Sequence, residues 1–390
     1  MYDYVWQESI ELLKYKSKTD KMEDMNMSEK LRVAVIGAGQ IANSAHIPAW
    51  KSTEGVEIVA VVDNRENVAE ITAKRYNIPN VYKDYKVMLE EIKPDIVSVC
   101  TPNNFHKPCA IAALEAGAHV LCEKPLSVSE KDAREMYDVA HRCGKYLMAS
   151  QSMRFDTRTK AAKALYDTGI VGDPYYVQAN LVRRRGIPKW GFFHMKEYNT
   201  AGPGFDLGVH VLDLLLWFMG SPAPISVSGR NYEKIGNTDE KLVESIADSG
   251  APVDLFTPRL YDWHEFNVED LTTAYIQLEG GITLMLKTSW ALNAPEEDNR
   301  CYISGTEGGL VVIPETTVLT NMGGYQVEIQ PKIPVQTHQT FEGHYGLTSH
   351  FVRVIRGEEE MIVTENQVLN VLRILDAIYE SSETGKEIRF

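Results

Sequence analysis

The sequence is poor in cysteine. Its 390 residues include five cysteines, an odd number, and no two of them form a C-x-x-C pair; they lie at positions 100, 109, 122, 143 and 301. The acidic N-terminal stretch has no secretory signal pattern. We therefore expect reduced cysteines and a cytoplasmic protein, and the pattern does not indicate a disulfide scaffold or a metal centre.

The sequence also lacks a surplus of basic residues and any long apolar run. Its formal net charge of −14 argues against nucleic acid and anionic membranes as partners, because both require a basic face. A membrane-spanning helix needs about 20 apolar residues. The most apolar segment, Val209–Met219, is shorter than that and contains His210 and Asp213.

The length predicts two domains, because 390 residues exceed what one compact core holds. The apolar fraction of 44% is that of an ordinary globular protein. We expect an N-terminal extension (1–30), a first domain (31–150), a second domain (151–363) and a final helix (364–390) that packs back on the first domain.

The stretch from Leu31 to Asp63 predicts a dinucleotide site. A buried strand, Leu31–Ile36, leads into the fingerprint Gly37-Ala38-Gly39-Gln40-Ile41-Ala42. Gly37 permits the turn, and Gly39 lets a pyrophosphate approach the next helix, whose free N–H groups favour an anion. A second strand, Val56–Val62, ends at Asp63, whose carboxylate suits a ribose hydroxyl. A glycine turn beside a surface aspartate is the alternative, but it leaves the position of the acid to chance.

The residues after the second strand bear on the choice of cofactor. Asp63 suits the free 2′-hydroxyl of NAD and repels the 2′-phosphate of NADP. Arg65, two residues later and next to Asn64, could instead pair with that phosphate or stack on adenine. We favour NAD, with NADP as the alternative.

The first domain continues as alternating strands and helices up to about Ala149. We expect helices over Val68–Tyr76, Tyr85–Glu91, Pro108–Ala116 and Ser129–Cys143, and strands over Ile96–Cys100, His119–Cys122 and Tyr146–Ala149. This order is typical of a doubly wound parallel sheet, whose ligands bind at the carboxyl ends of the strands. Gly37, Asp63, Thr101 and Glu123 all occupy such ends.

The second domain follows a different pattern. After a helix, Lys160–Thr168, and a strand, Tyr175–Arg184, a loop rich in Gly, Pro and aromatic residues (185–204) precedes the apolar helix from Asp206 to Gly220. Further strands are expected over Ile225–Asn231, Thr272–Glu279, Ile282–Trp290, Cys301–Ser304, Gly309–Ile313, Val318–Asn321 and Val327–Gln330. The spacing predicts an α+β domain with a large, mainly antiparallel open sheet. The polar segment 236–265 is expected to be a surface insertion.

Two local patterns are candidates for chemistry. Lys124 precedes Pro125 at a strand end, and the Lys–Pro bond is a candidate cis peptide that would turn the ammonium toward the cofactor; the alternative is a surface lysine. Asp206 and His210 lie four residues apart on a buried helix, where polar groups are costly unless they pair or line a cavity. We favour a functional role for both, whereas for Asp213 we favour a buried structural pairing.

Together these motifs resemble the Gfo/Idh/MocA oxidoreductases, the family of inositol dehydrogenase and glucose–fructose oxidoreductase. The resemblance covers about Leu31–Phe390. It rests on the glycine fingerprint, Glu123-Lys124-Pro125, Asp206-x-Gly208-x-His210 with Asp213, Thr101-Pro102-Asn103 with His106, Arg154-Phe155, Gly172-Asp173 and Gly305-Thr306-Glu307-Gly308. The extension 1–30 and the insertion 236–265 depart from the family pattern.

The resemblance implies a Rossmann domain, an open sheet that forms a subunit interface in a homo-oligomer, and hydride transfer between a sugar or polyol carbon and nicotinamide C4. The implied catalytic residues are Lys124, Asp206 and His210. His210, with a pKa near working pH, would take the hydroxyl proton, Lys124 would stabilise the oxygen, and Asp206 would orient the substrate or the imidazole.

The resemblance also implies contacts to the ligands. Thr101, Pro102, Asn103 and His106 would line the nicotinamide ribose, together with Glu123. Arg154 would hold substrate or support Glu123. Trp190 lies on the loop that closes the substrate cleft, near Phe192 and Arg183–Arg185, and each of these is as readily a packing or solvated residue as a ligand. No metal is implied.

Two other functions remain open at this point. A redox-neutral glycosidase of the same family would oxidise a sugar hydroxyl transiently and show no net NADH release. A cofactor-binding regulator without turnover is favoured by loss of the lysine or the histidine, and both residues are present. The motifs do not name the sugar or separate a dimer from a tetramer.

Overall fold

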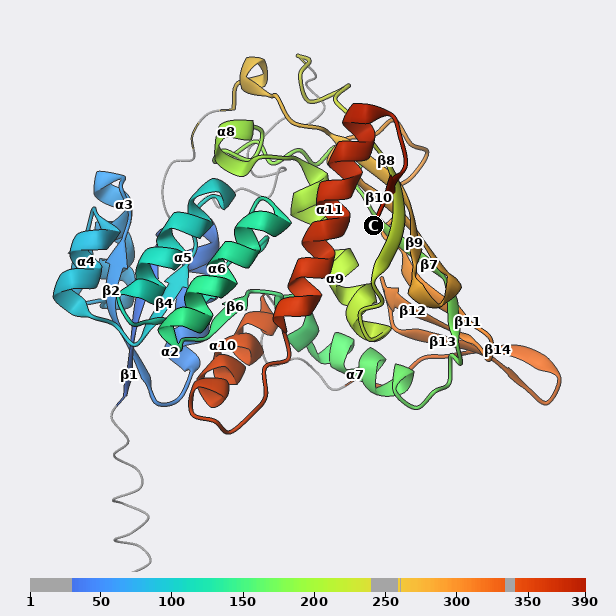
Figure 1. Ribbon diagram of the computed structural model, residues 1–390, viewed down its shortest axis with the longest axis horizontal. Coiled ribbons are helices and arrows are strands. Elements are labelled where there is room, and N and C mark those ends of the chain that lie inside the picture. Colours follow the sequence, from blue (N-terminus) through green and yellow to red (C-terminus); the bar gives the residue numbers. More distant parts are fainter. Residues whose placement is uncertain (1–29, 240–258, 260, 334–340) are drawn as a thin grey trace, which may run out of the picture.

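A parallel six-stranded sheet organises the first half of the chain. The computed structural model describes residues 30–239, 259, 261–333 and 341–390. The strand order is β3-β2-β1-β4-β5-β6, and every neighbouring pair is parallel (Figure 1). The strands are β1 (Leu31–Ile36), β2 (Val56–Val62), β3 (Asn80–Tyr82), β4 (Ile96–Val99), β5 (His119–Cys122) and β6 (Leu147–Ala149). This is the doubly wound order of a Rossmann fold.

The helices that connect these strands begin and end where local signals predict. They are α2 (Ile47–Ser52), α3 (Glu66–Tyr76), α4 (Tyr85–Ile92), α5 (His106–Glu115) and α6 (Glu130–Cys143). At the start of α6 the Ser129 hydroxyl accepts a hydrogen bond from the Asp132 N–H, and at its end Gly144 adopts a left-handed conformation with φ +62°. The short strand β3 was not predicted, because three residues carry too little periodicity.

The second half of the chain forms a nine-stranded sheet of order β14-β13-β12-β11-β7-β10-β9-β8-β15. Its strands are β7 (Pro174–Val182), β8 (Pro224–Tyr232), β9 (Leu271–Leu278), β10 (Ile282–Ser289), β11 (Cys301–Gly305), β12 (Gly309–Ile313), β13 (Thr317–Met322), β14 (Tyr325–Ile329) and β15 (Ile388–Arg389). The prediction of a mainly antiparallel sheet is confirmed. One pair, β7 with β10, is parallel, and that pairing brings together strands about a hundred residues apart.

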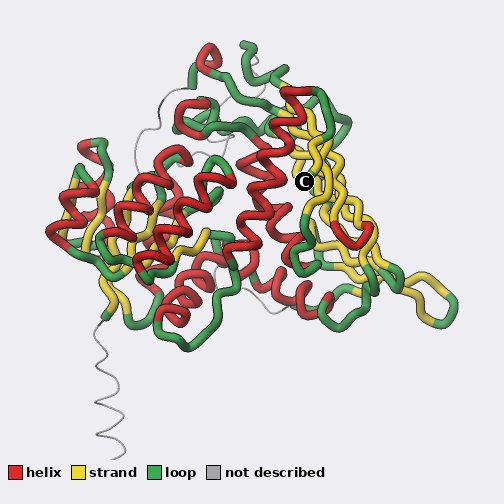
Figure 2. Tube along the Cα trace, viewed as in Figure 1, coloured by secondary structure: helices red, strands yellow, loops and turns green. Residues whose placement is uncertain are grey.

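Helices fill the space between the two sheets (Figure 2). They are α7 (Thr157–Tyr166), α8 (Lys196–Asn199), α9 (Val209–Phe218), α10 (Glu342–Ile355) and α11 (Glu365–Thr384). The final helix α11 packs across β8 and α9 and also contacts α6 of the first sheet's layer. Arg373 of α11 lies 2.9 Å from Glu130 at that contact. The expected contact with the first domain therefore exists, but the helix also covers the second sheet.

Two helices were missed, and two expectations fall largely outside the described residues. The polar sequence before helix α10 gave no clear signal for the start of a helix, and α8 lies within the expected loop 185–204. The extension 1–30 lies outside the described residues except for Lys30, and most of the insertion 236–265 does too. Within the described part of the chain, no helix combines the length and apolar character needed to cross a membrane.

Candidate active site

The glycine turn after β1 forms an open cradle. Gly37 has φ +92°, and a Cβ there would lie 2.7 Å from the carbonyl carbon of Cys100, so the close approach of β4 requires glycine. Among the described residues, a Cβ at Gly39 would meet only the Arg65 guanidinium, 3.9 Å away. The backbone at Gly39 therefore faces space where a pyrophosphate can approach the helix N-terminus.

Two buried polar atoms beside this cradle have no hydrogen-bond partner in the described part of the chain. The helix that starts at Gln40 includes a π-helical turn, Ala42–His46, before α2. The Gln40 amide oxygen and the Thr101 hydroxyl are buried and have no hydrogen-bond partner among the described residues. Buried polar groups are normally satisfied, so these two atoms fit a site that is completed by a polar ligand such as a dinucleotide.

Asp63 follows the last residue of β2, and both of its carboxylate oxygens accept hydrogen bonds. Oδ1 accepts a hydrogen bond from the Arg65 Nε at 2.9 Å, and Oδ2 accepts from Arg65 Nη2 at 2.9 Å and from the Ala38 N–H at 3.0 Å. Burial alone would raise the pKa of Asp63, but the Arg65 guanidinium holds it below its ordinary value. The sequence predicted the two residues as competing determinants of cofactor choice, and the structure joins them in one ion pair.

The segment after β4 docks the second half of the chain onto the first. The Asn103 Nδ2 donates to the Asn199 carbonyl at 3.2 Å, and Asn104 contacts the carbonyls of α8. His106 is buried, and its ring nitrogens contact the carbonyls of Pro125 at 2.7 Å and Thr101 at 2.9 Å. These contacts join two strand-end loops, and the expected contact of His106 with the nicotinamide ribose stays a prediction.

Lys124 is fixed by Asp206. The Lys124–Pro125 bond is cis, as the sequence suggested. The Lys124 ammonium donates to the Asp206 carbonyl and to its Oδ1, both at 3.0 Å, and Asp206 Oδ2 accepts from the Trp290 indole N–H at 3.0 Å. Burial would raise the pKa of Asp206, but the charge and hydrogen bond of Lys124 hold it below its ordinary value. Asp206 thus serves first to position the lysine.

His210 lies on α9, after a π-helical turn at Gly204–Gly208 that contains Asp206. Its Nδ1 is buried without a hydrogen-bond partner among the described residues. Burial and the nearby Lys124 charge lower the pKa of His210 to about 3. The expectation of a pKa near working pH is therefore wrong for the protein without ligands, and the imidazole is neutral at physiological pH.

Arg154 and Asp213 form a buried ion pair. Arg154 Nε and Nη2 donate to the two Asp213 oxygens at 2.8 and 2.6 Å, and Nη1 donates to the Ile362 carbonyl and to Gln367. The Arg154 residue is only 2% exposed. The structure confirms the pairing expected for Asp213 and corrects the expectation for Arg154, whose donors are committed to protein acceptors and not to substrate.

Glu123 also faces the interior. Its Oε1 lies 2.7 Å from His46 Nε2, while His46 Nδ1 lies 2.8 Å from the Ser98 hydroxyl. Burial would raise the pKa of Glu123, but the contacts with His344 and His46 hold it well below its ordinary value. The expected contact of this side chain with the cofactor is therefore not supported.

Sequence reasoning missed Trp290, which contacts Asp206, and two histidines that contact Glu123. Trp290 stands at the end of an expected strand with no motif around it, and His46 and His344 lie on helices where an isolated histidine carries no signal. In the loop between β7 and α9, the ring centroids of Trp190 and Phe193 lie 4.8 Å apart. A contact of Trp190 with substrate stays a prediction.

Comparison with known proteins identifies the family. Residues 31–151 match the family model of the Gfo/Idh/MocA oxidoreductases described as an NAD-binding Rossmann fold, and residues 163–390 match the model of their C-terminal alpha/beta domain. The chain belongs to the Gfo/Idh/MocA oxidoreductase family. It is an enzyme of the dehydrogenase type with an NAD-binding Rossmann domain.

Individual relatives of this family member are sugar-active enzymes by name. The D-glucoside 3-dehydrogenase of Escherichia coli is 33% identical over 368 residues, which span 94% of this chain and 99% of that protein. Levoglucosan dehydrogenase in complex with NADH and L-sorbose has a TM-score of 0.77 at 19% identity, covering 92% of this chain and 98% of that one. A myo-inositol dehydrogenase candidate from Sinorhizobium meliloti has a TM-score of 0.68 at 20% identity, covering 92% and 99%.

Proposed function

We propose that the protein oxidises a secondary hydroxyl group of a sugar, with D-glucosides as the first class to test and inositols and other polyols as the wider class. The observation that carries this proposal is the group formed by Lys124, Asp206 and His210 at the carboxyl end of β5. The similarity to D-glucoside 3-dehydrogenase across 94% of the chain supports the substrate class.

The proposed residues divide the chemistry between them. The neutral His210 imidazole accepts the proton of the substrate hydroxyl, and the Lys124 ammonium donates a hydrogen bond to the same oxygen as negative charge develops there. Asp206 keeps the ammonium in place through both of its contacts at 3.0 Å. When bound, NAD accepts the hydride that leaves the substrate carbon.

Protonation of His210 is costly at this position, since its pKa is lowered to about 3. The charges of Asp206 and Glu123 act in the opposite direction and favour the imidazolium. The nearby carboxylates of Asp206 and Glu123 therefore partly offset the cost of the proton that His210 accepts.

The residues proposed to hold NAD line the strand ends of the first sheet. The cradle at Gly37 and Gly39 receives the pyrophosphate, and Asp63 receives the adenosine ribose. The remaining proposed contacts are Gln40, Ile41, Asn64, Arg65, Thr101, Pro102 and Asn103. Arg65 already neutralises Asp63, so a 2′-phosphate would have to compete with the carboxylate for the guanidinium. This competition favours NAD over NADP.

Absorbance at the NADH band tests the proposal directly. Purified enzyme is incubated with NAD or NADP and a panel of glucosides, aldoses, inositols and uronates. Turnover with NAD and one sugar class, lost in His210→Asn, is the expected result. Consumption of a glycoside without net NADH would favour the redox-neutral glycosidase, and cofactor binding without any turnover would favour the regulator.

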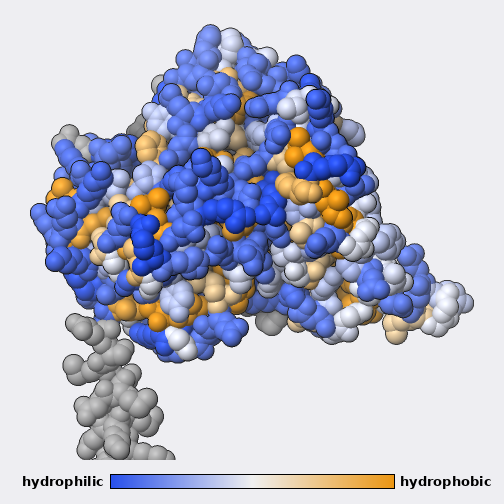
Figure 3. Space-filling view, in the orientation of Figure 1, coloured by the Kyte–Doolittle hydropathy of each residue, from blue (hydrophilic) through white to orange (hydrophobic). Residues whose placement is uncertain are grey.

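We also propose a homo-oligomer that is formed through the open face of the second sheet. Strand β9 alternates buried and partly exposed residues, and large side chains on the sheet are solvent-exposed; Tyr175, Tyr275 and Tyr325 are 55%, 40% and 77% exposed. The face seen in Figure 3 is mainly hydrophilic, with hydrophobic patches both beside the C-terminal end and over the first domain. Light scattering after gel filtration distinguishes monomer, dimer and tetramer.

A further inference from the structure

Three buried side chains converge outside the proposed catalytic group. They are His46 from the π-helical turn before α2, Glu123 from the end of β5, and His344 from the first turn of α10. The three residues are 0%, 6% and 5% exposed, respectively. One ligand atom from each lies within 4.8 Å of the others. Three segments that are far apart in the sequence thus place two imidazoles around one carboxylate.

We propose that His46, Glu123 and His344 bind a divalent transition-metal ion of the Zn²⁺ type. Two imidazoles and one carboxylate form a donor set that such ions take in proteins, with a fourth position left to water. Mg²⁺ and Ca²⁺ are disfavoured because they prefer oxygen ligands.

Two of the three donor-atom separations are near the value that a tetrahedral ion requires, and the third, between the two imidazoles, is within 4.8 Å. Bonds of about 2.0–2.1 Å in tetrahedral geometry place ligand atoms about 3.3 Å apart. Glu123 Oε1 lies 3.5 Å from His344 Nε2 and 2.7 Å from His46 Nε2. The first separation already fits, and the second, a hydrogen bond in the structure, has to open by about 0.6 Å.

Ser98 supplies the outer contact that a metal-binding imidazole needs. Histidine ligands almost always donate their second ring N–H to a neighbouring acceptor, which fixes the tautomer. The Ser98 hydroxyl lies 2.8 Å from His46 Nδ1, on the opposite side of the ring from Glu123. Metal binding through His46 Nε2 would make Nδ1 the donor to that hydroxyl.

His344 is the least satisfied member of the group. Neither of its ring nitrogens has a hydrogen-bond partner among the described residues, because its 3.5 Å contact with Glu123 is not a well-formed hydrogen bond. A buried imidazole without partners is costly. A metal bond to Nε2 would remove much of this cost, whereas the same three side chains without a metal leave it in place.

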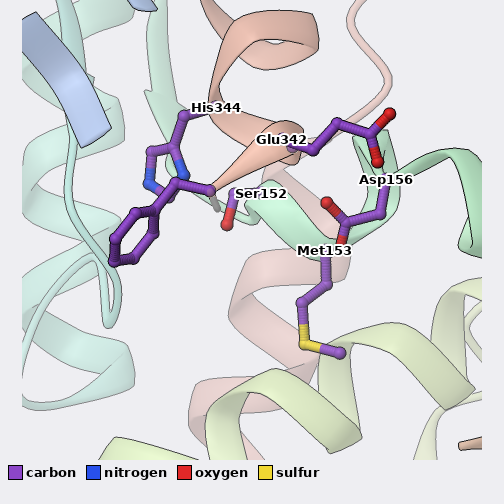
Figure 4. Close-up of a pocket in the computed structure, with 7 residues that line it drawn as sticks. Ser152, Met153, Asp156, Glu342 and His344 are labelled. Atoms are coloured by element: carbon purple, nitrogen blue, oxygen red, sulfur yellow. The ribbon is translucent and has the colours of Figure 1, made fainter. Parts of the chain in front are cut away.

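A cavity borders the proposed site at His344, which is the one member of the group among its lining residues. The cavity has a volume of about 300 Å³ and lies between the 3-10 turn Ser152–Phe155 and the start of α10. Figure 4 shows His344 on one side of it and the carboxylate groups of Asp156 and Glu342 on the other. A negatively lined cavity attracts a cation.

The experiment uses the untagged full-length protein, stripped of metal with a chelator. Zn²⁺ is titrated by calorimetry, Co²⁺ is added to read its ligand-field spectrum, and the melting temperature is followed with and without Zn²⁺. We expect binding of one ion per chain, a tetrahedral Co²⁺ spectrum, and a melting temperature that rises with Zn²⁺ concentration.

Variants assign the ion to this group. His344→Gln, which leaves the His46–Glu123 contact intact, should abolish the Co²⁺ spectrum and the thermal shift. Ser98→Ala should weaken Zn²⁺ about 10- to 100-fold, as loss of an outer contact does. His350→Gln is the matched control, because His350 lies on the same helix, is 1% exposed and contacts Glu359 instead.

Two results would overturn the proposal. The first is the absence of Zn²⁺ and Co²⁺ binding to the stripped wild-type protein, which would leave a His46–Glu123 hydrogen bond with His344 packed beside it. The second is binding that His344→Gln does not change, which would place the ion elsewhere, for instance on cysteine thiols. Both results are independent of whether the enzyme oxidises a sugar.

Discussion

Replacing Trp290 with phenylalanine tests how Lys124 is held in place. Trp290 is fully buried, and its indole N–H donates to Asp206 Oδ2 at 3.0 Å. Phenylalanine keeps most of the ring but removes this donor. Among the described residues, the Asp206 side chain then keeps its hydrogen bond with Lys124 and loses the one to Oδ2, so the carboxylate can rotate and the ammonium loses its fixed position.

The size of the effect follows from the type of bond. A hydrogen bond to a charged group contributes about 1.5–3 kcal/mol. If all of it is lost from the transition state, kcat falls by about 10- to 150-fold, since each 1.4 kcal/mol corresponds to a factor of ten. The Kd for NAD should stay unchanged, because the indole contacts Asp206 and not the glycine cradle.

The pH profile gives a second, independent reading. The hydrogen bond from Trp290 contributes to holding the pKa of Asp206 below its ordinary value. The ion pair with Lys124 is therefore present above that lowered pKa and is lost as the pH falls through it. Without the Trp290 donor the pKa of Asp206 rises, so the acid limb of activity should move to higher pH.

The assay is steady-state turnover on the identified sugar, measured across pH and alongside melting temperature. Trp50→Phe is the matched control, because Trp50 is 1% exposed and its indole N–H has no hydrogen-bond partner among the described residues. Both variants lose similar volume, so both should melt earlier. A folded Trp290→Phe enzyme with unchanged kcat and an unshifted acid limb would refute this reasoning.

Three further predictions concern other parts of the site. Arg154→Met should destabilise the protein by about 3–5 kcal/mol in urea unfolding, because it leaves Asp213 as an unpaired buried charge; unchanged stability would contradict the ion pair as described. Asp63→Ala should weaken NAD about 10- to 150-fold in calorimetry, since hydrogen bonds to a charged group are lost, and should weaken NADP less; equal losses for both cofactors would argue against a contact with the ribose. His210→Asn should lower kcat by about 10²- to 10⁴-fold without changing the melting temperature; turnover close to wild type would exclude His210 as the base.

Patterns of residues close together in the sequence were sufficient to predict most of the helices and strands. The buried runs before Gly37 and Asp63 predicted β1 and β2, and the capping signals at Ser129 and Gly144 predicted α6, because these elements depend on residues close in sequence. The elements that were missed depend on distant ones. Helix α10 packs against α2 and the turn Ser152–Phe155, and β3 exists through its pairing with β2.

The candidate site divides in the same way. The glycine turn, Asp63, Lys124 and His210 could be proposed from sequence because each lies in a motif whose spacing has a mechanical reason. Arg154 was assigned to a ligand because nothing local shows that Asp213 already occupies its donors, and nothing local shows the contacts of His106 with the carbonyls of Thr101 and Pro125. Partners of this kind are brought together only when the sheets and helices pack.

The sequence by itself determined that the chain makes a Rossmann turn for a dinucleotide, places a lysine after a strand end and sets an acid and a histidine four residues apart on one helix, since backbone conformation, strand ends and helical spacing are local properties. Tertiary structure decided what those side chains do. It gave Asp206 a second donor from Trp290, lowered the pKa of His210 through burial beside Lys124, and gathered His46, Glu123 and His344 into one group. Burial and charge act over a few ångströms in space, whatever the distance along the chain.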